Sequence, residues 1–334
     1  MAFIDELPEP VAHLIRSGAF SEFATLSSAG IPIDTPTYYF PSEDLTTLDI
    51  TTGLAYPAKA ERARRNPKVG LLIERNPDEP VISIAGLAAV RDADIQANLN
   101  RYVAETASLL PPGGTWEAMR RATFYWARIF VCVAPAHIRW WPNRAALETE
   151  QPSSWHAPPG TPYPVSDPAP SGKVSAAPEW PKYSWQELAA AALERKETGY
   201  LTLCDETGFP IPMRVRDVEQ TEEGFRLTAP RCAPWSEGIA TLSFFGREIF
   251  VCQARREGNR TVLRVERPLP VSPITPAGGN VPRPDRETRA ILTDRMDQEL
   301  RRRAQTTPAV PPEPLPPTTG ARLRMQAFAN AQAK

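Results

Sequence analysis

Cysteine, histidine and long apolar runs are scarce in this 334-residue sequence, and each scarcity bears on the class of protein. There are 4 cysteines and 3 histidines, and no two cysteines have the CxxC spacing typical of a structural zinc site. We therefore expect no metal centre, and cysteines that are small buried residues in a reducing compartment. No run approaches the ~20 apolar residues of a membrane helix. Residues 1–10 lack the basic and apolar segments of a signal peptide, so we expect a cytoplasmic protein.

An excess of charge of either sign is also missing. The 38 lysines and arginines nearly balance the 39 aspartates and glutamates, which gives a net charge of −1. Nucleic acids and anionic membranes attract strongly basic proteins, so this balance favours neither as a partner. Hydrophobic residues make up 42% of the chain, which is enough to build packed cores, and the length suggests two domains.

Proline, in contrast, is abundant, and its clusters predict the domain boundaries. The 38 prolines are more than the ~5% of average proteins would give. One cluster covers residues 151–182 among small polar residues, and it predicts a linker or an extended strap. We expect a first domain over 1–150, a second over 183–305, and a mobile proline-rich tail over 306–334.

The most informative stretch is Leu48–Glu74, whose pattern predicts strand, loop, basic helix and strand. β-Branched residues favour a strand over Asp49–Thr52, and helix formers favour a helix over Ala58–Arg65. Asn66-Pro67 ends that helix, because the residue before a proline is pushed out of the α conformation. The apolar run Val69–Ile73 has the length of a strand.

Residues of this stretch suit a bound phosphate monoester. Backbone N–H groups and the dipole at a helix N-terminus favour an anion, and a nearby lysine adds a point charge. The alternative is that the lysine and arginines of the helix form an ordinary solvated face. The candidate phosphate ligands are two hydroxyls, a glycine and three cations: Thr51, Thr52, Gly53, Lys59, Arg62 and Arg65.

The order and spacing of these features resemble the pyridoxamine 5'-phosphate oxidase-like family of FMN-binding split barrels. A strand ends in threonine, a lysine follows in the next turn, and Asn-Pro comes seven residues after the lysine and leads into a second strand. The resemblance covers about residues 10–142 and implies that Lys59 and the two threonines hold the FMN phosphate. Pro57 and Ala58 stand where family members often have a polar pair, so two phosphate contacts are missing.

Further elements complete one barrel in this prediction. Val81–Val90 predicts a strand, with Gly86 as a bulge or a point of close approach. Asp92–Leu110 predicts a helix, because its apolar residues recur at helical spacing. Ile129–Val133 predicts the last strand, with the sequence HIRWWP at His137–Pro142 following it.

A later stretch repeats the beginning of this pattern. Residues 199–230 match residues 22–53, since each has a hydrophobic-Thr-Leu strand, a Gly-x-Pro turn and a returning strand. We align Thr25 with Thr202 and expect one extra residue in the second turn. The repeat predicts a mainly β (α+β) chain with two tandem split barrels and peripheral helices. The second unit is reduced, because no lysine stands at the place of Lys59 and the long helix is missing.

The resemblance also implies how the two units act together. Family members are usually homodimers with FMN at the subunit interface, so a fused pair would form a pseudo-dimer within one chain, which could associate further as a homodimer. In the family's pyridoxamine phosphate oxidases an arginine on the returning strand reaches the flavin. Arg214 holds this place in the second unit and Thr37 in the first. Arg214 would contact a flavin or an acidic substrate, or lie on a solvated face.

Three further residues have open roles. Trp141 would flank the flavin ring, since a tryptophan after the last strand often packs near it in the family, or would pack with Trp140 against the linker. His137 would be a proton donor, a haem ligand or a hydrogen-bonded structural residue. Trp235 lies in the degenerate turn of the second unit, where it would fill the space of a second FMN.

These features together predict a flavin-dependent oxidoreductase with one FMN between the two units. It would transfer a hydride or electrons between a small organic substrate and NAD(P)H or oxygen, with the flavin ring carrying the redox step. Two alternatives stay open. One is a reductase that uses the deazaflavin F420 in the same barrel, and the other is a non-catalytic barrel that binds flavin or haem for sensing or storage.

Overall fold

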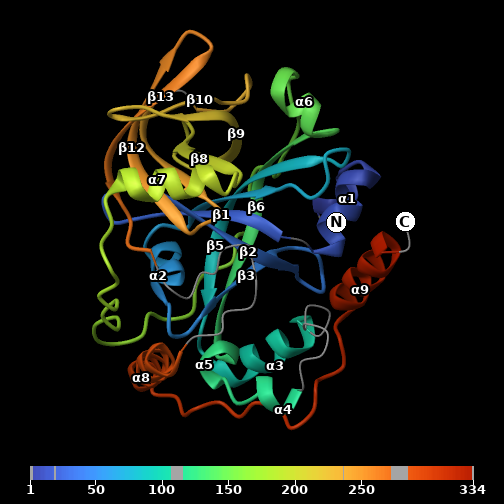
Figure 1. Ribbon diagram of the computed structural model, residues 1–334. Helices are drawn as coiled ribbons and strands as arrows, with labels where there is room; N and C mark the ends of the chain where they lie inside the picture. The colour runs from blue at the N-terminus through green and yellow to red at the C-terminus, as the bar shows by residue number, and fades with distance from the viewer. Residues whose placement is uncertain (1–2, 19, 107–115, 236, 272–284, 333–334) are drawn as a thin grey trace.

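Two antiparallel β-barrels lie side by side in this chain, and helices surround them (Figure 1). The computed structural model describes all of the chain except residues 1–2, 19, 107–115, 236, 272–284 and 333–334. Among the described helices, none has the length and apolar character needed to cross a bilayer.

The first barrel closes from six antiparallel strands in the order β3-β2-β1-β4-β5-β6, with β3 paired to β6. Alternate side chains of these strands point inward, so Phe23, Ile50 and Leu71 are fully buried in its core. The prediction of one split barrel in the first half of the chain is confirmed. The strands are β1 (Phe20–Leu26), β2 (Pro32–Pro41), β3 (Leu48–Gly53), β4 (Lys68–Ile73), β5 (Val81–Arg91) and β6 (Arg128–Trp141).

Helices cover the outside of this barrel. They are η1 (Phe3–Glu6), α1 (Glu9–Ser17), α2 (Ala58–Arg65), α3 (Ile95–Thr106), α4 (Trp116–Met119), α5 (Thr123–Trp126) and α6 (Arg144–Thr149). The bounds of α2 are those predicted, and Asn66 after it is extended (φ −133°, ψ 108°) ahead of Pro67. The helix predicted to start at Asp92 is α3, and the predicted residues 107–110 lie outside the described residues.

The last strand of the barrel is longer than predicted. β6 runs through His137 to its end at Trp141, and β7 (Ser153–His156), within the predicted linker, pairs with its second half. The prediction that the strand ends before His137 is wrong. The β5–β6 register shifts at Gly86, opposite Pro135, so the bulge accommodates a proline that has no N–H to donate. The extra residue of the bulge is Ala136 of β6, and a Cβ at Gly86 would lie 2.5 Å from Val133, so the predicted close approach at Gly86 is confirmed.

The second barrel repeats the topology of the first. Its strands are hydrogen-bonded in the order β10-β13-β12-β11-β8-β9. When β8 to β13 are matched one by one with β1 to β6, each strand has the same two neighbours as its counterpart in the first barrel, which confirms two tandem split barrels. β12 leads directly into β13, so the counterpart of α3 is missing, as predicted. The elements are α7 (Trp185–Glu194), β8 (Gly199–Cys204), β9 (Pro210–Gln220), β10 (Gly224–Thr228), β11 (Gly238–Phe244), β12 (Glu248–Glu257) and β13 (Arg260–Pro268).

The strand pairing corrects one detail of the repeat. In each barrel a proline starts the second strand opposite the last residue of the first strand: Leu26 with Pro32, and Cys204 with Pro210. The two turns are therefore equally long (27–31 and 205–209), and the predicted extra residue is wrong. Thr202 matches Ala24 rather than Thr25. A shift of one residue reverses the face of every side chain, so Thr202 and Thr25 point to opposite faces of their sheets.

The C-terminal helices return to the first barrel. α8 (Arg286–Arg302) places Leu292 and Leu300 in the core cluster of that barrel and lies beside α5 (Figure 1). α9 (Thr319–Gln332), within the proline-rich tail, contacts α1 and α3. The end of the chain therefore covers the unit that carries the predicted phosphate turn, although the second barrel lies between them in sequence.

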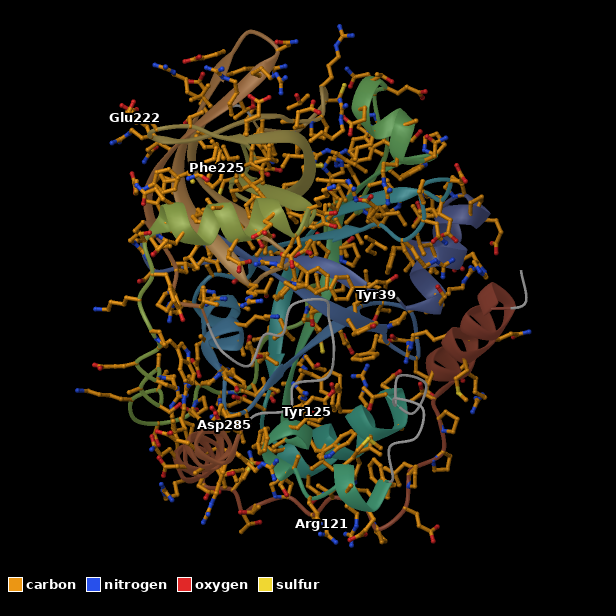
Figure 2. The ribbon with its side chains drawn as sticks, in the orientation of Figure 1. Tyr39, Arg121, Tyr125, Glu222, Phe225 and Asp285 are labelled. Atoms are coloured by element: carbon orange, nitrogen blue, oxygen red, sulfur yellow. The ribbon has the colours of Figure 1, made fainter. Side chains whose placement is uncertain are left out.

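Two core clusters are marked by Tyr39 in the first barrel and Phe225 in the second (Figure 2), and the second cluster also includes Leu72 and Trp141 of the first barrel. The barrels meet along β1, β2 and β4 of the first and β8, β9 and β11 of the second. Gly70 is needed at this contact, because a Cβ there would overlap the carbonyl oxygen of Pro210. The two units therefore approach each other at backbone distance.

Candidate functional site

The turn between β3 and α2 is built from the residues that the sequence singles out. The Thr52 hydroxyl donates to the Tyr56 carbonyl oxygen at 2.9 Å, and the Tyr56 N–H donates to the Gly53 carbonyl oxygen at 2.8 Å. A Cβ at Gly53 would lie 3.2 Å from the Tyr56 ring, so glycine lets the ring pack close to the strand end. Thr51 and Thr52 are buried beside it. The structure thus brings three of the predicted residues into one tight turn.

The N-terminus of α2, which follows this turn, has no side-chain cap. Pro57 occupies the N-cap position without a capping hydrogen bond, and Ala58 is the first helical residue. The first N–H groups of an α-helix have no acceptor within the helix, and with the helix dipole they attract an anion. Apolar residues at the two places before Lys59 therefore leave this helix end open to an external acceptor.

Lys59 is a half-buried cation without a hydrogen bond or ion pair to any residue that the structure describes. Its ammonium lies 5.8 Å from the centre of the Phe23 ring. Burial and the charge of Arg62 lower the pKa of Lys59 to about 7, although the carboxyls of Glu22 and Asp34 act in the opposite direction. An anion beside Lys59 would favour its charged form, so this environment suits a phosphate group.

Arg62 lies on the same side of α2 as Lys59. Its Nε donates to the Thr25 hydroxyl at 2.7 Å, and within the described chain it has no carboxylate partner. Burial and the charge of Arg65 lower its pKa to about 10. Arg65 itself is exposed at the end of the helix, so it adds only a screened charge.

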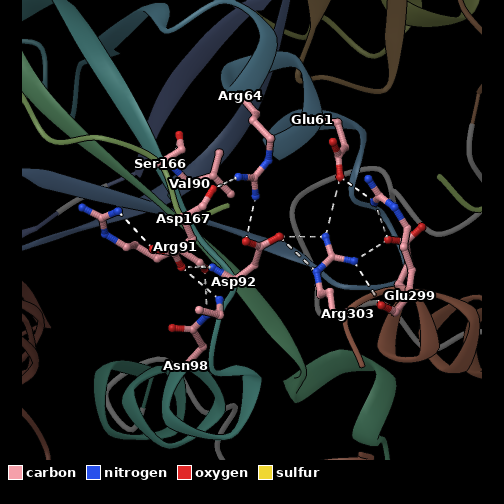
Figure 3. Close-up of polar contacts among 12 residues, drawn as sticks. Glu61, Arg64, Val90, Arg91, Asp92, Asn98, Ser166, Asp167, Glu299 and Arg303 are labelled. Carbon is pink, nitrogen blue, oxygen red and sulfur yellow. Dashed lines mark hydrogen bonds and ion pairs between the residues drawn. The ribbon is translucent and has the colours of Figure 1, made fainter. Parts of the chain in front are cut away.

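Other charged residues of α2 belong to an ion-pair network (Figure 3). Glu61 binds Arg302 of α8 at 2.6 Å, and Arg64 binds Asp92 at 2.7 Å. Arg303, just after α8, also binds Asp92 at 3.0 Å. The network therefore ties α2 to α8 and takes up the carboxylates of Glu61 and Asp92, while Lys59 and Arg62 form no ion pair within the described chain.

Arg128 is a further cation at the turn, and sequence reasoning missed it. It starts β6 and pairs with Gly53, and its Nη1 would lie 3.5 Å from a Cβ at Gly53. Its guanidinium lies 4.3 Å from the centre of the Tyr102 ring and 4.5 Å from that of Tyr125, and it donates to the Tyr102 hydroxyl at 3.1 Å. Only the pairing of β3 with β6 brings it here, and no spacing in the sequence indicates that pairing.

The remaining predicted cofactor ligands have other partners. The Thr37 hydroxyl on β2 donates to a neighbouring carbonyl oxygen at 3.3 Å. Arg214 on β9 forms an ion pair of 3.0 Å with Glu74 of the first barrel, so it joins the barrels rather than lying on a solvated face. Trp141 is fully buried and donates from Nε1 to the Glu150 carbonyl oxygen at 3.0 Å. Their contact with a flavin stays a prediction.

His137 lies on β6 and stacks on His156 of β7, with 3.8 Å between the ring centres. Burial and the charge of Arg139 lower the pKa of His137 to about 4, so the ring is neutral at pH 7. Its buried Nε2 has no hydrogen-bond partner among the described residues. Its roles as proton donor or haem ligand stay predictions.

A buried carboxyl pair, which the sequence does not reveal, lies on the first hairpin. β1–β2 pairing sets Ala24 opposite Asp34, so Glu22 and Asp34 are diagonal neighbours on one face of the sheet. Glu22 is 2% exposed and Asp34 is fully buried. Burial and their proximity raise the pKa of Glu22, and burial raises that of Asp34 to about 7. One of the two is therefore protonated at neutral pH.

Two cavities occur elsewhere on the described surface. One of about 560 Å³ lies between the β2–β3 turn, α3 and α9, and includes Arg16, Arg101 and Glu43. Another of about 320 Å³ includes Arg139 and Asp205. The β3–α2 turn lines neither of them. α8 packs beside the turn, so a ligand bound at the turn would also lie beside α8.

Comparison with known proteins gives structural relatives only. No family model and no curated protein matches the sequence. An FMN-binding protein related to pyridoxamine 5'-phosphate oxidase from Nostoc punctiforme is 13% identical, with 45% of this chain and 95% of that chain covered and a TM-score of 0.32. General stress protein 26 from Bacillus anthracis is 18% identical, with 45% and 97% covered and a TM-score of 0.29. An F420 reductase is 15% identical, with 41% and 100% covered and a TM-score of 0.28.

Each of these solved chains matches less than half of this one. The fold itself follows from the strand order, which is the same in both halves of the chain. This protein therefore has a tandem split-barrel fold, the fold that its sequence resemblance to the pyridoxamine 5'-phosphate oxidase-like proteins predicts.

Proposed function

We propose that the β3–α2 turn binds the phosphate of FMN and that the protein is a flavin-dependent oxidoreductase. The observation that supports this is the group of cations at the turn, Lys59, Arg62 and Arg128, which have no carboxylate partner in the described chain. These cations are half-buried, and charge that is partly removed from water without a partner is costly, so a phosphate dianion would stabilise this arrangement. The uncapped N-terminus of α2 would add backbone N–H donors.

The residues fit a phosphate, and the chemistry would come from the flavin. A bound flavin supplies hydride or electron transfer, and the protein supplies binding, orientation and electrostatics. Lys59 and Arg62 would hold the phosphate, and the Gly53 turn would let it approach the backbone. The substrate would be a small organic molecule, with NAD(P)H or oxygen as the second reactant. A reductase using F420 is the runner-up, because its phosphate would suit the same turn.

One cofactor per chain follows from the second barrel. The turn after β10 has no lysine at the place of Lys59, and no helix replaces α2 in its described residues. Trp235 in this turn is 8% exposed, packs in the second core and donates to the Ile211 carbonyl oxygen at 2.9 Å. A turn filled by Trp235, with neither the lysine nor the helix of the first unit, would give a second phosphate no comparable binding site.

The test is the absorbance spectrum of the purified protein, with the supernatant after heat denaturation run against FMN, FAD and haem standards. The proposal expects about one FMN per chain. Two per chain would refute the assignment of the second turn as closed. A Soret band would point to the haem-binding alternative, and a colourless protein active only with added F420 to the runner-up. No binding after incubation with FMN would overturn the FMN proposal.

A further inference from the structure

α8 contributes a buried arginine to the region of the β3–α2 turn. The helix follows the second barrel in sequence but packs on the first, where Leu292 and Leu300 join the core. Arg295 lies between them in sequence and is 8% exposed. Its guanidinium lies 5.8 Å from the centre of the Tyr56 ring. A residue more than 230 positions away from the turn in sequence therefore lies against it in the fold.

Arg295 has no ion-pair partner in the part of the chain that the structure describes. Its Nε is buried without a hydrogen-bond partner there, and burial lowers its pKa. The acid of its own helix whose charge acts on Arg295 is Glu299, and that carboxylate is already held by Arg302 at 3.0 Å and by Arg303. The N–H of Ser175 also donates to Glu299 at 2.6 Å. Because a buried guanidinium keeps its charge, it requires a counter-anion that these neighbours do not supply.

The Tyr56 hydroxyl marks where such an anion would lie. It too is buried without a hydrogen-bond partner among the described residues. Burial raises the pKa of Tyr56, and the charges of Arg295 and Arg128 oppose that rise, so both guanidinium groups lie near its phenol. The charge of Arg128 also acts on Lys59. Two guanidinium groups, one ammonium and one phenol donor thus surround a single turn.

We infer that Arg295 of α8, together with the Tyr56 hydroxyl, binds the phosphate monoester dianion at the β3–α2 turn. The inference rests on the proposed function and extends it to a helix outside both barrels. Pro57 and Ala58 provide no polar side chains before Lys59, and the Arg295 guanidinium supplies donors in their place. α8 is then a wall of the cofactor site as well as a packing element.

The experiment compares FMN with riboflavin, which has the same ring but no phosphate, on the full-length protein. Dissociation constants are measured by flavin fluorescence for the wild type, Arg295→Met, Arg295→Lys and Arg289→Met. Methionine keeps the apolar stem that packs under α8. Arg289 is an exposed arginine of the same helix and serves as the matched control.

The inference expects Arg295→Met to weaken FMN by about tenfold or more, the effect of one charge-assisted hydrogen bond. Riboflavin affinity should change little, Arg295→Lys should recover part of the loss, and Arg289→Met should bind FMN like the wild type. Equal losses for FMN and riboflavin would show that Arg295 only stabilises α8, and would overturn the inference. An unchanged FMN affinity in Arg295→Met would overturn it as well.

The proposed function fails in a different way from the inference. If the wild type binds neither flavin, or binds FMN no tighter than riboflavin, the phosphate site itself is wrong. If the wild type prefers FMN and Lys59→Met loses that preference while Arg295→Met keeps it, the phosphate site stands and only the role of Arg295 is refuted.

Discussion

Replacing Asp34 by asparagine should make the protein less sensitive to pH between about 4 and 7. Asp34 is fully buried, and none of its carboxylate oxygens has an N–H or O–H donor among the described residues. Burial raises its pKa from the ordinary 3.8 to about 7. An acid whose pKa is raised by folding stabilises the fold fully below its unfolded pKa. That contribution is lost as the pH rises through the folded pKa.

The size of the effect follows from the two pKa values. A difference of one pKa unit is worth 1.36 kcal/mol, so the rise of Asp34 to about 7 corresponds to about 4 kcal/mol at most. Asparagine has nearly the same shape, does not ionise, and carries an amide N–H₂ that can donate to Glu22. At pH 4.5 the variant should match the wild type within about 1 kcal/mol, the value of one hydrogen bond. At pH 8 it should be the more stable of the two, by up to about 4 kcal/mol.

Urea unfolding followed by tryptophan fluorescence at pH 4.5, 6 and 8 measures this difference. Other groups also titrate in this range, since the pKa of His137 is lowered to about 4 and that of Lys59 to about 7. The contribution of His137 cancels when variant and wild type are compared at each pH, whereas Lys59 adds to the difference because the charge of Asp34 acts on its pKa. Asp78→Asn, at an exposed acid, is the control. A flat difference for Asp34→Asn would refute the raised pKa of Asp34.

Three other predictions concern the phosphate turn and the contact between the barrels. Lys59→Met should weaken the binding of FMN by about 1.5–3 kcal/mol, the range for a charged hydrogen bond, and the binding of riboflavin much less. Equal FMN affinities of variant and wild type would remove Lys59 from the site. Because burial lowers the pKa of Lys59 to about 7, the FMN affinity of the wild type should fall as the pH rises from 7 to 9, and titrations should show that Lys59→Met has lost this dependence. Gly70→Val should destabilise the protein by about 3 kcal/mol or more, because the valine side chain would overlap the Pro210 backbone. It should also expose the interface between the barrels to proteolysis. A variant as resistant to protease as the wild type would contradict the close contact.

Local patterns in the sequence predict the β3–α2 turn well. Helix formers, an Asn-Pro stop and flanking strands set the bounds of α2 at Ala58–Arg65, and the structure has these same bounds. Its geometry depends on neighbours within a few residues, as in the hydrogen bond from Thr52 to the Tyr56 carbonyl oxygen. The repeat of the Gly-x-Pro turn likewise predicts the second barrel, because that turn fixes which strands pair.

Long-range packing, by contrast, is not visible in local patterns. Arg295 reaches the turn only because α8 returns across the second barrel to the first. The Glu22–Asp34 pair depends on the register of two strands, and its burial depends on what covers that face. The error in aligning Thr202 has the same origin, since one residue of register reverses the face and only strand pairing reveals it.

The barrels meet with β4 against β9 and β11 against β2, which are equivalent pairs of strands, but the residues at the two contacts differ. Gly70 on β4 pairs with Ala24, and Thr241 on β11 pairs with Thr202, which is the counterpart of Ala24. Gly70 and Thr241 are therefore equivalent positions in the two units. Gly70 admits the backbone of Pro210, whereas the equivalent Thr241 carries a side chain where Gly70 has none.

A homodimer of identical subunits cannot make such a contact on one side only, because both copies carry the same residue. Fusion of the two units removes that constraint, so each can specialise. The first unit keeps the cations and the open helix end at the β3–α2 turn, and the second fills its own turn with Trp235. One cofactor site per chain is the arrangement that this asymmetry favours.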